Sequence, residues 1–168
     1  MTAAEQRAGT APARPRDYSG AVYGSLLAAS VVAGTGTPGP YPRIQLVALL
    51  LITGVVFWAA HVYARLAGER LGERELSGRE LRRVALHEWP LVQAAVPPAI
   101  AVAISPLLGL GLEGTAWLAL AVAVTEQVGW ASVAVRRAGA SLRLTVLAGV
   151  GNLLLGLVIV AAKAALSH

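Results

Sequence analysis

Long apolar stretches alternate with short polar or Gly/Pro-rich segments along most of the chain. A helix that crosses the roughly 30 Å hydrocarbon core of a bilayer needs about 20 mainly apolar residues, and apolar runs of this length are typical of transmembrane helices. The pattern therefore predicts an all-α, polytopic membrane protein with a bundle of five transmembrane helices. The predicted spans are residues 18–34, 44–67, 90–112, 115–135 and 144–166.

The third span is the least regular of the five, because Pro97, Pro98 and Pro106 interrupt it. Proline removes a backbone donor and kinks or breaks a helix. A break at membrane depth is tolerated where neighbouring protein or a water-lined cavity satisfies the freed carbonyl groups. We therefore expect a broken helix in this span.

The polar segment between the second and third spans, residues 68–89, mixes leucines with glutamates and arginines. The spacing of leucine and charge fits a short amphipathic helix that lies on the membrane surface. A solvated, charged loop is the alternative for the same residues.

The first apolar run follows a stretch, residues 1–17, that is rich in Ala, Arg, Pro and Thr and is predicted to be a disordered cytoplasmic tail. A signal peptide is one interpretation of such a run. However, no clear A-x-A cleavage site ends it, and Gly20 and Gly24 form a G-x-x-x-G pattern that favours helix packing. We favour a retained helix, so that residues 18–168 form one transmembrane domain.

Composition supports the membrane class. The chain is 56% hydrophobic and 14% charged, whereas a soluble domain carries about 25% charged residues. A net charge of +5 would suggest a nucleic-acid partner in a soluble protein, but here the arginines lie in short loops between apolar runs. The absence of cysteine excludes disulfides, thiolate metal sites and cysteine nucleophiles.

The basic residues test the helix count. With five spans, twelve of the 14 fall in the N-terminal tail and in alternate loops on the same side, and only Arg43 and Lys163 fall on the other. The positive-inside rule then places the N-terminus in the cytoplasm and the C-terminus outside. Thirteen of the 14 are arginine, a bias that suggests a bacterial protein of the cytoplasmic (inner) membrane.

Several polar side chains interrupt the apolar spans, and five of them form the candidate cluster. Glu126 lies near the middle of the fourth span, and a charge at that depth costs at least about 2.5–3.5 kcal/mol. Small residues share its helical face, so it is expected to point into the bundle. The predicted buried polar cluster consists of Glu126, Gln127 and Asn152 at mid-depth, with His61 and Gln93 nearer the cytoplasm.

Two interpretations of this cluster stay open. In the first, the polar groups bond one another and fix the register of the helices, each contributing about 0.6 kcal/mol on average. In the second, Glu126 and His61 exchange protons and form part of a proton-linked channel or transporter.

The sequence favours a structural or accessory membrane protein over an enzyme. It lacks H-E-x-x-H, P-loop and G-x-S-x-G motifs, and neither a metal nor another cofactor is expected. The expected partner is the lipid bilayer, without nucleic acid. A homo-oligomer or a membrane-protein partner is a further candidate, and the Gly20/Gly24 stripe is one contact that would serve it. Packing within the chain explains the stripe equally well.

Overall fold

The computed structural model describes residues 18–35, 40–68 and 77–166. Their regular elements are helices, and no strand occurs among them. The predicted tail, residues 1–17, lies outside the described residues, as do residues 69–76 of the polar segment. The elements are α1 (Ser19–Gly34), α2 (Pro42–Gly68), α3 (Gly78–Glu88), α4 (Pro90–Gln93), α5 (Val96–Ile104), the 3-10 helix η2 (Ser105–Leu108), α6 (Leu112–Arg137) and α7 (Leu142–Leu166).

This arrangement confirms a helical bundle of the membrane type. Four helical segments of the described chain are long and apolar enough to cross a bilayer, and one of them combines α3, α4, α5 and η2. The helix α1 is shorter, with 16 residues, or about 24 Å at 1.5 Å per residue. The four long segments are Pro42–Gly68, Gly78–Leu108, Leu112–Arg137 and Leu142–Ala165.

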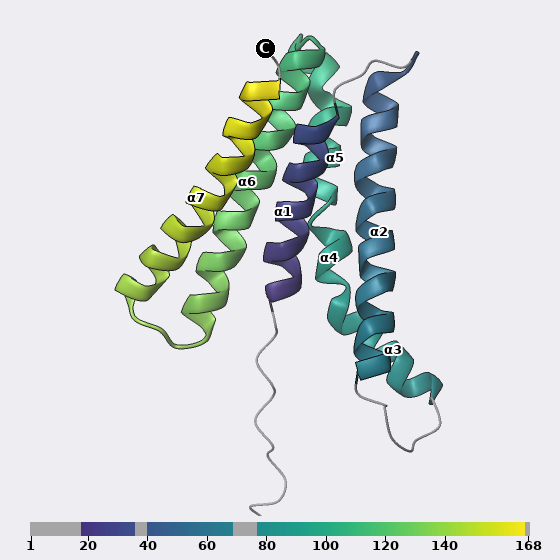
Figure 1. The fold of residues 1–168 in the computed structure, drawn as a ribbon, viewed down its shortest axis with the longest axis vertical. Coiled ribbons are helices and arrows are strands. Elements are labelled where there is room, and N and C mark those ends of the chain that lie inside the picture. Colours follow the sequence, from purple (N-terminus) through teal and green to yellow (C-terminus); the bar gives the residue numbers. More distant parts are fainter. Residues whose placement is uncertain (1–17, 36–39, 69–76, 167–168) are drawn as a thin grey trace, which may run out of the picture.

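The long elements run alternately in opposite directions (Figure 1). The helix α1 rises through the middle of the bundle, α2 descends, α4 and α5 rise, α6 descends and α7 rises again. The end of α7 therefore lies at the opposite end of the molecule from the start of α1. Because α1 contacts α2, α4, α6 and α7, this helix, which is shorter than the four long segments, is central to the bundle.

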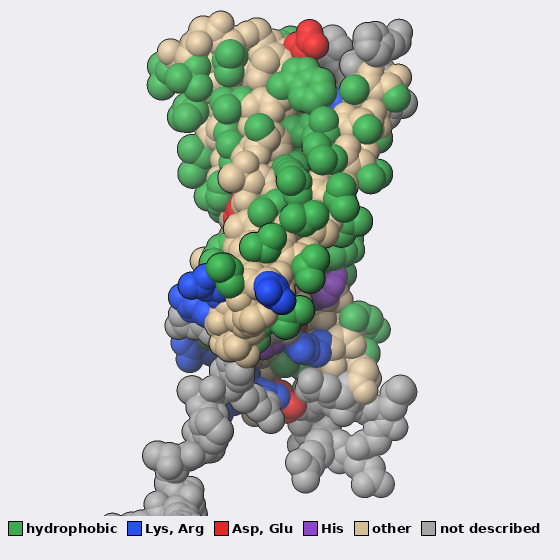
Figure 2. Space-filling view, turned by 90° about the vertical axis from the view of Figure 1, so that its left-hand side faces the viewer, with side chains coloured by type: hydrophobic (Ala, Val, Ile, Leu, Met, Phe, Trp, Pro, Cys, Tyr) green, Lys and Arg blue, Asp and Glu red, His purple; other side chains and the backbone are tan. Residues whose placement is uncertain are grey.

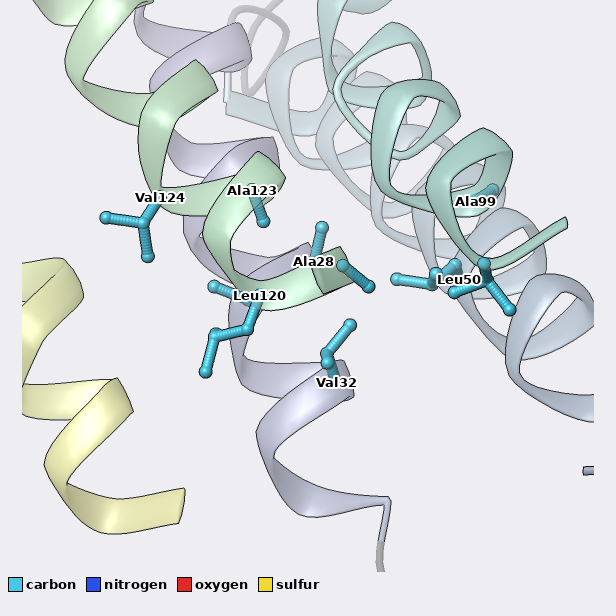
Figure 3. Close-up of a cluster of buried hydrophobic side chains, with 10 residues drawn as sticks. Ala28, Val32, Leu50, Ala99, Leu120, Ala123 and Val124 are labelled. Carbon is cyan, nitrogen blue, oxygen red and sulfur yellow. The ribbon is translucent and has the colours of Figure 1, made fainter. Parts of the chain in front are cut away.

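The core is built from small side chains at the meeting point of α1, α2, α5 and α6 (Figure 3). Alanines such as Ala29 and Ala123 are completely buried there, and their size lets helix backbones approach closely. By contrast, large apolar side chains of α2 and α7 point outward, including Ile52 and Val158, at 61% and 67% exposed. An apolar surface of this extent marks a lipid or protein contact rather than a water-exposed face.

The predicted break in the third span lies between α4, which ends at Gln93, and α5, which begins at Val96. Pro97 and Pro98 occupy the first turn of α5, where a missing N–H removes no intrahelical hydrogen bond. Farther along, Pro106 is the second residue of the 3-10 helix η2, and Gly109, just after its end, adopts the left-handed conformation.

Neighbouring helices enclose this break. Ala94 and Ala95 are 0% and 3% exposed. A Cβ atom added to Gly24 of α1 would lie 2.8 Å from the Cβ of Ala94, and one added to Gly54 of α2 would lie 3.1 Å from that of Ala95. The break thus packs between glycines of two helices. It is buried in protein, which is the condition under which irregular backbone is tolerated at membrane depth.

A helix occurs within the polar segment, over Gly78–Glu88, and it packs on the end of α2. The indole of Trp58 donates a 2.8 Å hydrogen bond to the carbonyl of Ala85. Arg65 forms an ion pair with Glu88, and the rings of Trp58 and Trp89 meet edge to face at 5.7 Å. These contacts fix the position of α3 against α2.

Basic side chains gather at one end of the molecule (Figure 2). On the face shown, they lie below a band of hydrophobic side chains. Seven described arginines belong to this end, whereas Arg43 and Lys163 belong to the other. The seven are Arg65, Arg79, Arg82, Arg83, Arg136, Arg137 and Arg143.

Candidate functional site

Glu126 lies in the middle of α6 and is half-buried. Its Oε1 atom accepts a 2.9 Å hydrogen bond from the indole of Trp130, one turn farther along the helix. Its Oε2 atom is buried and has no hydrogen-bond partner among the described residues. One half of this carboxyl group is therefore satisfied within α6, and the other half is left without a donor.

A series of aromatic and cation–π contacts links Glu126 to the basic end of the molecule. The ring of Trp130 stacks on that of Tyr18, just before α1, at 5.6 Å and 22°. Arg137 donates a hydrogen bond to the Tyr18 hydroxyl and also lies 5.3 Å from the centre of its ring. These contacts hold the lower half of α6 against the beginning of α1.

Gln127 and Asn152 form the polar contact between α6 and α7. Gln127 is completely buried, and its Nε2 donates to the Asn152 carbonyl at 3.2 Å and to Asn152 Oδ1 at 3.3 Å. The Asn152 amide in turn donates to the carbonyl of Ala148 at 3.0 Å. The Oε1 atom of Gln127 is buried without a partner in the described chain.

His61 lies apart from these groups, on α2. Its Nδ1 is 2.9 Å from the carbonyl of Phe57, and its ring is 5.4 Å from that of Tyr23 on α1. No hydrogen bond or ion pair joins it to Glu126 within the described residues. The imidazole is thus held by its own helix and by α1.

Gln93 is exposed, in contrast to the expectation of a buried side chain. The reason is the rotation of the single turn α4. Leu91, Val92, Ala94 and Ala95 all face the core, and Gln93, between them in sequence, is left on the outer face. The structure therefore brings Gln127 and Asn152 together with Glu126 beside them, and leaves His61 and Gln93 outside this group.

The interior between α1, α2 and the broken helix is almost filled. A cavity there measures about 10 Å³ and is lined by Gly24, Thr53, Gly54 and Phe57 among others. That is room for about one water molecule. Among the described residues, no group of three or more His, Cys, Asp or Glu is placed to hold a metal ion.

The Gly20/Gly24 stripe packs within the chain, against α4. A Cβ atom on Gly24 would lie 2.9 Å from the Leu91 carbonyl oxygen, and one on Gly20 would lie 3.6 Å from the Leu91 side chain. The stripe thus serves the intramolecular packing that was one of its two interpretations.

A second polar network lies at the end opposite the basic one, and the pattern of the sequence does not predict it. Arg43 donates to Ser105 Oγ at 3.2 Å and to the Leu110 carbonyl at 2.6 Å. Thr115 donates to Ser105 Oγ at 2.8 Å, and both hydroxyl residues are buried. The signal for it was Arg43 itself, one of the two basic residues that the structure describes at this end of the bundle.

The comparisons with known proteins add no relative to this description. No protein-family model, no curated protein and no solved structure matches the chain.

Proposed function

We propose that the protein is an integral membrane protein with a structural or accessory role and without enzymatic activity. In this proposal all five predicted spans cross the bilayer, with the N-terminus inside and the C-terminus outside. The alternating helix directions (Figure 1) and the concentration of arginine at one end support it, because basic residues flank the cytoplasmic ends of membrane helices. The arginine-rich composition supports the cytoplasmic membrane of a bacterium.

The short helix α1 fits this proposal because of its position. It lies among α2, α4, α6 and α7, so its 16 residues are covered by protein rather than by lipid over much of their surface. At the basic end, α3 fits the surface helix predicted between the second and third spans, since Arg79 and Arg82 are exposed on it.

The observation that carries the accessory role is how the polar groups are used. Gln127 binds Asn152 across the α6–α7 contact, and His61 binds its own helix. The cavity inside the bundle, at about 10 Å³, is too small for a chain of water molecules. The hydrogen bonds of these polar side chains thus support helix packing, and the cavity between α1, α2 and the broken helix is too small to be a path for a solute.

A proton-linked channel or transporter is the second candidate, and Glu126 favours it. Its Oε2 atom is buried without a described partner, and an ionisable group inside a membrane is by default a functional hypothesis. Such a function would require a proton route to Glu126 that does not pass through His61.

Proton flux into proteoliposomes that contain a pH-sensitive dye separates the two candidates. The accessory role predicts that the wild-type protein and the Glu126→Gln variant leave the vesicles as proton-tight as empty ones. Glu113→Gln is a matched control, because Glu113 accepts from Trp117 at the same i, i+4 spacing, 3.4 Å away. A wild-type leak that is lost in Glu126→Gln and kept in Glu113→Gln would overturn the accessory role.

A further inference from the structure

A groove of about 390 Å³ lies between the basic ends of α6 and α7. The groove is a shallow, open depression rather than an enclosed cavity. Figure 2 views the molecule from the α7 side, where basic side chains gather below the hydrophobic band. The groove is lined by Ser132, Val133, Arg136, Arg137 and Thr145.

The two arginines differ in how they are held. Arg137 is fixed by Tyr18, through a hydrogen bond to the hydroxyl and through its position over the ring. Arg136 makes no hydrogen bond or ion pair with any residue that the structure describes. A guanidinium group has five N–H donors, so Arg137 keeps most of its donors and Arg136 keeps all of them for a ligand.

The other polar groups in the groove are already satisfied. Ser132 donates to the carbonyl of Val128 at 2.8 Å, and Thr145 donates to that of Ser141 at 3.2 Å. The donors left for a ligand are therefore those of the arginines. The connection between α6 and α7, residues 138–141, contains no acidic residue that would compete for them.

Donors of this kind select a phosphate group. Arginine binds phosphate through two parallel N–H···O bonds, which fix the direction of the ligand as well as its charge. Thr145 lies in the first turn of α7, whose N-terminal dipole also favours an anion. In the proposed membrane placement, this groove lies at the level of the lipid headgroups, and Val133, 38% exposed, forms its apolar side.

We propose that this groove binds the phosphate group of an anionic phospholipid through Arg136 and Arg137. The inference rests on the membrane placement in the proposed function, but not on the orientation or on the absence of proton flux. The Tyr18 contact sets the direction of Arg137, so Tyr18 is a positioning residue for the site.

The test is the thermal midpoint of the full chain in an uncharged detergent, titrated with phosphatidylglycerol or phosphatidylcholine. A ligand that binds only the folded state raises the midpoint, and the rise grows with the logarithm of the ligand concentration relative to its dissociation constant. We expect the wild type to be stabilised by phosphatidylglycerol at lower concentrations than by phosphatidylcholine. Arg136→Gln should weaken phosphatidylglycerol binding about fivefold, the factor that corresponds to about 1 kcal/mol per basic residue at an anionic surface.

Two further variants keep the proposal falsifiable. The double variant Arg79→Gln/Arg82→Gln removes the same charge from the same end but outside the groove, and it should bind phosphatidylglycerol nearly as the wild type does. Tyr18→Phe keeps the ring and removes the hydroxyl. It should weaken phosphatidylglycerol binding, because the hydroxyl no longer holds Arg137 in place. The comparison is with the double variant Arg136→Gln/Arg137→Gln. If it and Arg79→Gln/Arg82→Gln weaken phosphatidylglycerol binding equally, the groove is not a specific site, and the lipid is attracted by the overall positive charge of this end.

Inorganic phosphate in the same assay separates the two sources of a phosphate group. Full stabilisation by inorganic phosphate, lost in Arg136→Gln, would show a site for a free anion and overturn the lipid assignment. No preference for phosphatidylglycerol over phosphatidylcholine would overturn the site as a whole. Neither result affects the proton-flux test. The lipid-binding proposal and the proposed accessory role can therefore fail independently of each other.

Discussion

Arg43 shows how a single charged residue can join three elements. It belongs to the first turn of α2 and reaches Ser105 at the start of η2 and the carbonyl of Leu110 before α6. A carbonyl that follows a 3-10 helix has no helical partner, and Arg43 supplies one. Its charge is therefore structural as well as a marker of topology.

We expect Arg43→Met to destabilise the bundle by roughly 1.5–3 kcal/mol, the range for a hydrogen bond to a charged group. The methionine keeps an apolar stem and removes the donors. Thermal unfolding in detergent should show a midpoint lower by several degrees. Arg82→Met on the exposed side of α3 makes the same exchange without this network, and an equal loss there would contradict the role of Arg43.

For single polar residues, the sequence predicts the depth in the membrane better than it predicts which residues they contact. Gln127 and Asn152 fall at the same level because each lies near the middle of its span, and the structure joins them. The position of His61 relative to Glu126 depends on how α2 and α6 rotate around α1, and no periodicity within one helix specifies that rotation. The exposure of Gln93 has the same origin.

Glycines set the distances between elements, as a comparison of two positions shows. A Cβ atom on Gly24 would lie 2.8 Å from Ala94 and 2.9 Å from the Leu91 carbonyl oxygen, whereas one on Gly129 would meet nothing within 4 Å. A glycine within a helix therefore marks a close contact only where another helix approaches it.

We predict opposite effects for the same substitution at these two glycines. Gly24→Ala should destabilise the bundle by about 1–3 kcal/mol through overpacking. Gly129→Ala should stabilise it by about 0.5–1 kcal/mol, because alanine is the better helix former. Unfolding midpoints of the two variants measured in the same detergent test this difference. A stable Gly24→Ala variant would contradict the close approach of α1 and α4.

The attachment of α3 to α2 depends on a partly buried ion pair. The Glu88 side chain is 11% exposed and that of its partner Arg65 is 38% exposed. By comparison, Glu80 and Arg83 are 3.9 Å apart with side chains that are 32% and 61% exposed, and exposed pairs of this kind contribute only about 0.2–1 kcal/mol.

We therefore expect Glu88→Gln to loosen α3, because it removes the carboxylate through which α3 binds Arg65 of α2, at a cost of roughly 1.5–3 kcal/mol. Hydrogen exchange over residues 78–88 should become faster, with little change in α6 and α7. Glu80→Gln changes the more exposed of the two pairs and should accelerate the exchange of α3 less than Glu88→Gln does. Equal acceleration in both variants would argue against a specific role of the buried pair.

For the whole molecule, run length and the placement of proline and arginine predict most of the architecture. They predict the helical class, the break before α5 and the basic end. They do not predict that α1, which is shorter than the four long apolar segments, is central, because its apolar composition is similar to that of a lipid-facing helix. The small residues Ala21, Gly24 and Ala28, all buried on α1, are the signal for that position.

The proposed orientation gives the last prediction, because each crossing reverses the side of the chain. A reporter that is active only outside the cytoplasm should be active when fused after the last residue, and inactive when fused at Gly139, between α6 and α7. An N-terminal tag should resist protease added to intact cells. The tag tests α1, whose 16 residues are fewer than the roughly 20 of a lipid-exposed span. A C-terminal fusion active only in the cytoplasm would contradict five crossings. An accessible N-terminal tag together with an external C-terminus would instead indicate that α1 enters the bundle without crossing the bilayer.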